Sequence, residues 1–295
     1  MSVVLTEPGL YDGVPAEDYH ADPVPGGSLS STGARRLLPP SCPAKFRYYI
    51  EHGQKPRREF DLGHAAHRVL FGAGPEIVLV EADTYRTKAA QAQRDEARAA
   101  GRVPLLSHEH EQVQAMVAQV RAEPLLAALL DAERGKAEQT LVWRDQATGV
   151  MCRARLDWLS TVTSAGRRVL LDYKTAGAVD PDSLSRSMFD HGYYLQAAWY
   201  RAGVTAVLSE PTAFVFVAQE KEPPYLVTTY EPDVVALRWG QVLAAKALRL
   251  YARCQTTGRW PGYADAVIPL PLPPWAEYRL EDVTADPDPQ EGLAS

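Results

Sequence analysis

The chain has 295 residues, 46% of them hydrophobic, which is enough to bury a sizeable core in one large domain or two small ones. The net charge of −6 excludes the global basic field of a protein that coats nucleic acid or anionic membranes non-specifically. Cys42, Cys152 and Cys254 are odd in number and widely spaced, which argues against a disulfide framework. Without a long apolar run or a leader pattern, the sequence predicts a cytoplasmic protein with no membrane association.

The first half of the chain predicts an extended segment followed by helices. Residues 1–27 are rich in Pro, Gly and Asp, and helices are expected over 28–38, 41–53 and 59–72. A strand is expected over 76–82, and a mostly helical insertion over 84–131. Positive charge gathers locally between the first of these helices and the third, at Arg35, Arg36, Lys45, Arg47, Lys55, Arg57 and Arg58.

The second half predicts a sheet with helical crossovers. Strands are expected at 138–145, 150–160 and 168–176, then a helix at 182–202, strands at 213–220 and 225–231, and a long helix at 232–258. Residues 28–262 are therefore interpreted as one α/β domain that includes the 84–131 insertion. Residues 263–295 form a proline-rich acidic tail, expected to be extended or disordered at its end.

Two strands carry acids that face the same region. Along 150–158, residues Val150 to Trp158 at even positions should face the core, and Arg153, Arg155 and Asp157 should face the other side. Asp157 precedes Asp172 by fifteen residues, a spacing that a tight strand-turn-strand connection folds back on itself. The two carboxylates are thus expected to converge.

Asp172 and Lys174 lie two apart on one strand and so project from the same face. Taken alone, the pair is equally consistent with a surface ion pair of little energetic weight. Converging carboxylates repel unless a cation joins them, and Mg²⁺, with Mn²⁺ as a substitute, is a cation that carboxylates hold. A lysine beside such an ion can stabilise charge on phosphoryl oxygens, so the set indicates phosphodiester hydrolysis.

This arrangement resembles the PD-(D/E)XK nuclease superfamily, and within its RecB-type branch the RecE-like (exonuclease VIII) phage exonucleases. D-x-K alone is a frequent pattern, whereas a full set of motifs in the right order is specific. The motifs are "YHADP", "SLSSTGARRLLPPSCPAKFRYY", "GHAAH", "CRARLDW", "LDYKT", "GYYLQAAWY" and "FVAQEKEPPY", and they cover roughly residues 19–262.

The resemblance implies a PD-(D/E)XK core, with a central mixed sheet of about five strands flanked by helices. It also implies that Asp157 and Asp172 bind the metal, with the carbonyl of Tyr173 as a further ligand, and that Lys174 is catalytic. His67 occupies the motif histidine, whereas His64 lies outside the pattern. An acid is often found near a second metal position in related nucleases, and Glu138 is the candidate, with a solvated strand end as the alternative.

Other candidates are positioned by the helix at 182–202 and the strand at 150–160. Gln196 and Tyr200 share one helix face. The resemblance implies that Gln196 helps to hold the metal site or the substrate backbone, and Tyr200 is a candidate DNA contact. Tyr193 has a ring able to stack on unpaired bases, although aromatic packing explains it equally well. Arg153 and Arg155 are candidate phosphate contacts, with pairing to neighbouring acids as the alternative.

By resemblance, the expected activity is that of a Mg²⁺-dependent exodeoxyribonuclease acting on linear double-stranded DNA ends. The expected polarity is 5′ to 3′, leaving 3′ single-stranded overhangs for recombination in a phage or prophage. A RecT-like single-strand annealing protein is the expected partner, and a ring-shaped homo-oligomer would explain processivity.

Three alternatives remain open at this stage. An endonuclease would use the same site, and a covalently closed circle distinguishes it because an exonuclease needs an end. A helicase-linked nuclease module is disfavoured, since the sequence has no G-x-x-x-x-G-K-[ST] phosphate loop. A catalytically inactive nuclease fold that binds DNA ends is the alternative from a different class.

Overall fold

A computed structural model describes residues 2–53, 61–164 and 166–285. The chain divides into two compact units, Met1–Trp260 and Pro261–Ser295. The first unit contains the predicted α/β domain together with the N-terminal segment. Of the predicted basic residues, Lys55, Arg57 and Arg58 lie outside the described residues.

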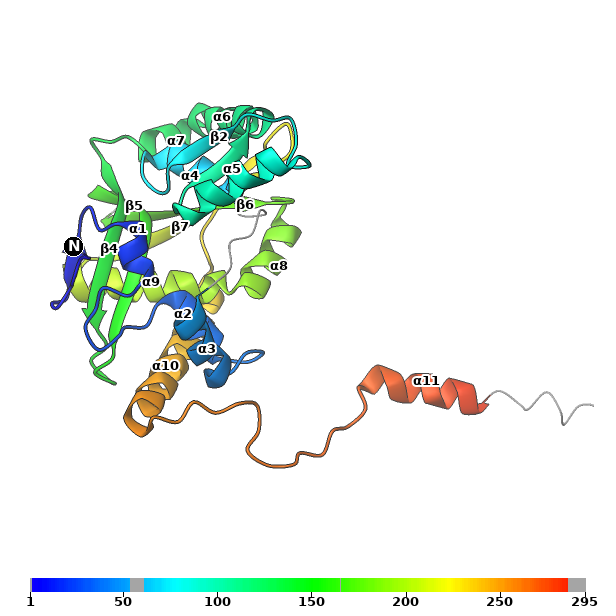
Figure 1. Ribbon diagram of the computed structural model, residues 1–295. Helices are drawn as coiled ribbons and strands as arrows, with labels where there is room; N and C mark the ends of the chain where they lie inside the picture. Colours follow the sequence, from blue (N-terminus) through cyan, green and yellow to red (C-terminus); the bar gives the residue numbers. More distant parts are fainter. Residues whose placement is uncertain (1, 54–60, 165, 286–295) are drawn as a thin grey trace, which may run out of the picture. The chain divides into compact units, whose positions relative to one another are not determined.

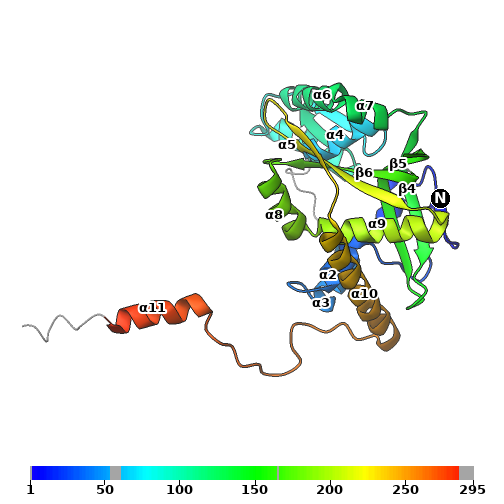
Figure 2. The same cartoon turned by 180° about the vertical axis from the view of Figure 1, so that it is seen from behind.

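A six-stranded sheet forms the centre of the first unit (Figures 1 and 2). Its strand order is β1-β4-β5-β6-β7-β8, and only β6 and β7 pair in parallel. The parallel pair follows from the helical crossover between those two strands. The predicted mixed sheet flanked by helices is thus confirmed. The strands are β1 Gly9–Tyr11, β4 Gly135–Arg144, β5 Met151–Ser164, β6 Arg167–Ala176, β7 Thr212–Glu220 and β8 Val227–Tyr230.

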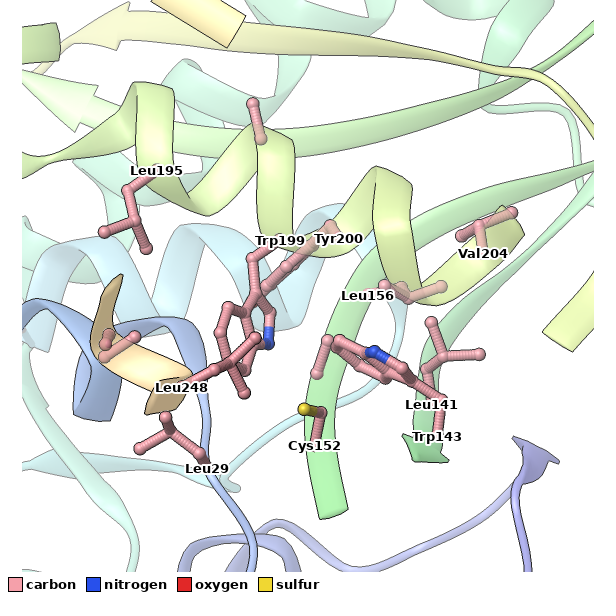
Figure 3. Close-up of a cluster of buried hydrophobic side chains, with 14 of the residues drawn as sticks. Leu29, Leu141, Trp143, Cys152, Leu156, Leu195, Trp199, Tyr200, Val204 and Leu248 are labelled. Carbon is pink, nitrogen blue, oxygen red and sulfur yellow. The ribbon is translucent and has the colours of Figure 1, made fainter. Parts of the chain in front are cut away.

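Helices from distant parts of the sequence pack on one face of the sheet. This layer contains α2 Ser31–Leu37, α3 Pro43–His52, α9 Tyr193–Leu208 and α10 Val234–Thr257. Figure 3 shows Trp199 of α9 among Leu29, Cys152 and Leu248, and Trp143 of β4 close to Leu141 and Leu156. This core holds α9 firmly against β4 and β5.

A second core on the opposite face joins the sheet to the region around the predicted insertion. It is built with α4 Asp61–Phe71, α6 Ser107–Ala122 and α7 Pro124–Leu129. The insertion was predicted to be mostly helical, and α5 Lys88–Ala99 agrees, but β3 Val103–Leu106 also runs through it. This strand pairs in parallel with β2 Ile77–Val80, and all four of its residues are buried, as is usual for parallel strands.

Two local predictions were wrong. The helix expected over 182–202 is broken into α8 Pro181–His191 and α9, since Gly192 adopts a left-handed φ of 69° that ends α8. Trp158 was expected on the same face as Leu156 but packs in the opposite core. The side-chain alternation inverts there, opposite Glu138 on β4, which has a left-handed φ of 56°.

Both ends of the chain contain more structure than predicted. The 1–27 segment includes β1 and the short helix α1 Ala16–His20. The second unit contains α11 Pro274–Ala285, although this tail was expected to be extended. The expected disorder at its end concerns residues 286–295, which lie outside the described range. No helix in the described part of the chain is long and apolar enough to cross a membrane.

Candidate active site

Helix α4 brings His67 to the sheet because small residues precede it. A Cβ at Gly63 would lie 3.1 Å from Thr175 Oγ1, so glycine permits the close approach of α4 to the end of β6. Ala65 and Ala66 are fully buried in the same turn. The spacing of "GHAAH" thus places His67 over the sheet, whereas His64 is exposed.

His67, Glu138 and Asp157 meet in one cluster. His67 Nε2 lies 3.2 Å from Glu138 Oε1 and 3.4 Å from Asp157 Oδ1. One possible ligand atom from each residue lies within 4.8 Å of the others. Glu138 reaches this position through its left-handed backbone, a conformation that costs a non-glycine residue energy and is concentrated at functional sites.

Asp172 and Lys174 form the second part of the site, on β6. Lys174 Nζ lies 2.5 Å from Asp172 Oδ2, and Gln196 of α9 donates a 2.6 Å hydrogen bond to Asp172 Oδ1. The Asp172 side chain is 1% exposed, and that of Lys174 is 26% exposed. The lysine is therefore the member of the pair that solvent or a substrate can reach.

Backbone and side-chain contacts of Tyr173 join the two parts. Its backbone N–H donates to Asp157 Oδ2 at 2.9 Å, and its hydroxyl donates to Gln219 Oε1 at 2.6 Å. Gln219 is fully buried and donates in turn to the carbonyl of Met116 at 2.8 Å. Tyr173 thus holds Asp157 while being fixed itself. Its carbonyl as a metal ligand stays a prediction.

The three carboxylates share one geometric feature. Each has one oxygen anchored by the protein: Glu138 Oε2 by Arg155, Asp157 Oδ2 by Tyr173, and Asp172 Oδ1 by Gln196. The other oxygens of Glu138 and Asp157 face His67, and that of Asp172 contacts Lys174. No described residue gives Asp172 Oδ2 a bond of hydrogen-bonding geometry. Glu138 and Asp157 are therefore each oriented with one oxygen directed into the cluster, whereas Asp172 is oriented toward Lys174.

The electrostatics of the cluster reflect burial opposed by neighbouring charge. Burial alone lowers the pKa of His67, but Asp157 and Glu138 outweigh it and hold this pKa above its usual value. Burial raises the pKa of Asp172 despite the nearby Lys174. The pKa of Asp157 is lowered, because His67 and Lys174 outweigh the effect of burial. Positive charge beside Asp172 is therefore what favours its ionised form.

The residues fit a divalent metal ion. Two carboxylate oxygens and an imidazole nitrogen already converge, and Asp172 adds a buried carboxylate that Lys174 contacts. Oxygen and imidazole ligands suit several divalent ions. The predicted set His67, Glu138 and Asp157 is brought together, with Asp172 linked to it through Tyr173.

The two arginines predicted to bind DNA instead form ion pairs and hydrogen bonds within the protein. Arg153 is buried, lies 2.8 Å from Asp22 Oδ2 and donates to the Ser28 carbonyl at 2.7 Å. Arg155 pairs with Glu138 and donates to the Val14 carbonyl at 2.8 Å. This geometry favours the alternative of pairing with acids, so Arg153 holds the N-terminal segment and Arg155 orients Glu138.

The tyrosines of α9 differ in their surroundings. Tyr200 is buried in the core, and burial raises the pKa of its phenol. Tyr193 is half-buried, and its ring centroid lies 5.5 Å from Lys174 Nζ. Tyr193 therefore borders the site, whereas a contact between Tyr200 and DNA would require the core to open.

Gln219 is the residue of this site that sequence reasoning missed. The sequence did indicate its position. Side chains of β7 alternate between two faces, and Gln219 lies on the same face as the apolar Val215 and Val217. A polar residue at an inward position must find hydrogen-bond partners, here Tyr173 and Met116.

The sheet, its helical crossover and the carboxylate-lysine site define a PD-(D/E)XK-type domain. Comparison with family models agrees, because residues 30–268 match the family described as PDDEXK-like domain of unknown function (DUF3799). The chain belongs to this family. The expected superfamily is thereby confirmed.

A solved structure shows the same fold. The chain is similar to a candidate exonuclease from Eubacterium rectale, with a TM-score of 0.56 and 12% identity over 92% of this chain and 96% of that one. An alkaline exonuclease from Laribacter hongkongensis matches with a TM-score of 0.27 and 14% identity, over 68% of this chain and 96% of that one. No curated protein matches the sequence.

Proposed function

We propose that this protein is a metal-dependent exodeoxyribonuclease that degrades linear double-stranded DNA. The family and the site support a nuclease, and one observation carries the chemistry. Each of the three carboxylates has one oxygen anchored and the other directed at His67 or Lys174, the arrangement that a phosphodiester-cleaving metal site requires. The exonuclease character rests on the motif resemblance and on the names of the structural neighbours.

The protein's own groups have separate tasks in this reaction. Asp172 holds the Lys174 ammonium through an ion pair of 2.5 Å. The ammonium stabilises the negative charge that develops on the phosphoryl oxygens and positions the attacking water. Gln196 fixes the rotamer of Asp172, and Tyr173 fixes that of Asp157. Such fixed geometry is what lowers the barrier of an in-line displacement.

Glu138, Asp157, Asp172 and His67 would hold the metal ion, which we propose to be Mg²⁺ with Mn²⁺ as a substitute. When bound, a divalent ion supplies Lewis-acid polarisation of the phosphate and a lower pKa for the attacking water. Arg155 keeps Glu138 turned toward the cluster by pairing with its other oxygen.

The finer points of the proposal follow the motif resemblance. We include a 5′ to 3′ polarity that leaves 3′ overhangs for recombination, a ring-shaped homo-oligomer, and a RecT-like annealing protein as partner. Support for these is the order of the motifs from "GHAAH" to "FVAQEKEPPY".

The test is cleavage of a linear duplex labelled separately at its 5′ and 3′ ends, in Mg²⁺ or EDTA, beside a covalently closed circle. We expect metal-dependent release from 5′ ends, no cleavage of the circle, and no activity in Lys174→Ala. Cleavage of the circle would make the protein an endonuclease. DNA-end binding without cleavage in Mg²⁺ or Mn²⁺ would overturn the catalytic proposal in favour of a binding protein.

A further inference from the structure

An exposed aromatic corner lies where α8 ends and α9 begins. Phe189, in the last turn of α8, is 74% exposed. Its ring is stacked with that of Tyr194, with centroids 6.4 Å apart and planes 9° from parallel. Phe214 and Phe216 on β7 are buried, whereas Tyr48 and Trp239 are, like Phe189, exposed aromatic residues of the first unit. The exposed ring of Phe189, stacked on the half-buried Tyr194, presents an apolar surface to solvent, at a cost that burial would avoid.

This aromatic corner, Phe189 and Tyr194, adjoins the catalytic lysine. Tyr193, which precedes Tyr194, has its ring centroid 5.5 Å from Lys174 Nζ. Consecutive residues of α9 thus contact Lys174 on one side and Phe189 on the other. The break at Gly192 produces this arrangement, because a continuous helix could not turn Phe189 back toward Tyr194.

Cationic groups border the corner. Arg35 of α2 donates through its guanidinium to the Asp190 carbonyl, and its side chain lies against Gly192. Arg186 is exposed one turn before Phe189 on α8. Asp190 is also exposed there, so the corner is mixed in charge and not an acidic surface. An aromatic face with nearby arginines fits the base and the phosphates of an unpaired nucleotide.

We propose that Phe189 and Tyr194 form a stacking platform for an unpaired base of the DNA strand whose phosphodiester lies at Lys174. This rests on the proposed nuclease function and deepens it. Every base has a π face, so the platform binds without sequence preference. The substrate it selects is a strand end that is single-stranded or frayed, and a blunt end must open by one or more bases to use it.

The direct test places 2-aminopurine at the terminal positions of a duplex and measures its fluorescence when the protein binds in Ca²⁺. Stacking on the platform should quench the probe in the wild type and in Phe189→Trp. In Phe189→Leu, which keeps apolar bulk but removes the π face, the quench should be lost. Leu79→Ala is the matched control, because Leu79 is an exposed apolar residue of β2.

Steady-state cleavage gives the second readout. On blunt duplex, kcat/KM should fall about tenfold in Phe189→Leu and stay near wild type in Phe189→Trp and Leu79→Ala. A duplex with a short unpaired end should be the better substrate for wild type, and this preference should shrink in Phe189→Leu. Phe189 is exposed, so these variants should fold, which circular dichroism verifies.

Equal quenching and equal kcat/KM in wild type and Phe189→Leu would overturn the platform while leaving the nuclease intact. A wild type that quenches the probe but cleaves no DNA would remove the proposed function and keep the platform. A change of molecular mass in Phe189→Leu on sedimentation, with quenching unaltered, would show that the corner is a protein interface and would overturn the proposal.

Discussion

Two neighbouring strands, β5 and β6, each place charged residues at alternate positions, yet the protein uses them differently. On β5, Arg153 and Arg155 are paired with Asp22 and Glu138. On β6, Lys174 is paired with Asp172 but remains 26% exposed. Arg153 and Arg155 of β5 thus hold the structure together, while the positive charge of Lys174 on β6 is available to a substrate.

The difference comes from what covers each strand. The N-terminal segment lies over the arginines of β5, since the Ser28 carbonyl accepts from Arg153 and the Val14 carbonyl accepts from Arg155. Lys174, by contrast, pairs with Asp172 and lies beside the ring of Tyr193. Alternation along a strand therefore indicates which residues share a face, but tertiary contacts decide which of them can react.

The largest effect is expected for Asp157→Asn, which removes a charge from the point where the two strands meet. Activity on linear duplex should fall by about 10³-fold or more, because a metal ion's contribution of several kcal/mol is lost. Initial rates at saturating Mg²⁺ measure this. Asp95→Asn on the exposed surface of α5 is the control. A loss below tenfold would exclude Asp157 as a ligand.

Lys174→Gln should reduce kcat by about 10²–10³-fold, as expected for loss of one group that stabilises transition-state charge. The amide keeps a polar side chain beside Asp172, so affinity for the metal should be retained. Single-turnover cleavage and Mn²⁺ titration measure the two quantities. A variant that lost both together would show that Lys174 is needed to build the site and not for the reaction itself.

Tyr173→Phe should have an intermediate effect, because it removes the hydroxyl that Gln219 accepts. An unsatisfied buried Gln219 costs about 1–3 kcal/mol in the free energy of unfolding. Activity should fall several-fold, since the hydroxyl bond to Gln219 anchors the residue whose backbone N–H positions Asp157. Urea unfolding and a double-mutant cycle with Gln219→Leu measure the coupling. Additive effects of the two substitutions would disprove the link.

Arg153→Met should leave catalysis nearly unchanged and lower the free energy of unfolding by about 2 kcal/mol. The reason is that charged hydrogen bonds to Asp22 and Ser28 are lost inside the protein. Chemical denaturation and the salt dependence of DNA binding check this. A reduced salt slope with unchanged stability would restore Arg153 as a phosphate contact.

Much of the site was predictable, because strand alternation is set locally along the chain and the order of the motifs can be read directly from the sequence. Asp172 and Lys174 share a face as predicted, and the resemblance indicated His67, Glu138 and Gln196. What could not be predicted depends on distant contacts or backbone exceptions. The burial of Arg153 requires a segment 125 residues earlier, and the inversion at Trp158 requires the left-handed Glu138.

The most direct test of the central claim is calorimetric titration of Mn²⁺ and Mg²⁺ into the wild-type protein and into Asp157→Asn. The central claim is that His67, Glu138 and Asp157 form a metal centre served by Asp172 and Lys174. We expect saturable binding in the wild type that falls by at least about tenfold in affinity in the variant. Equal binding by both proteins, or none by the wild type alongside full cleavage of DNA in EDTA, would contradict it.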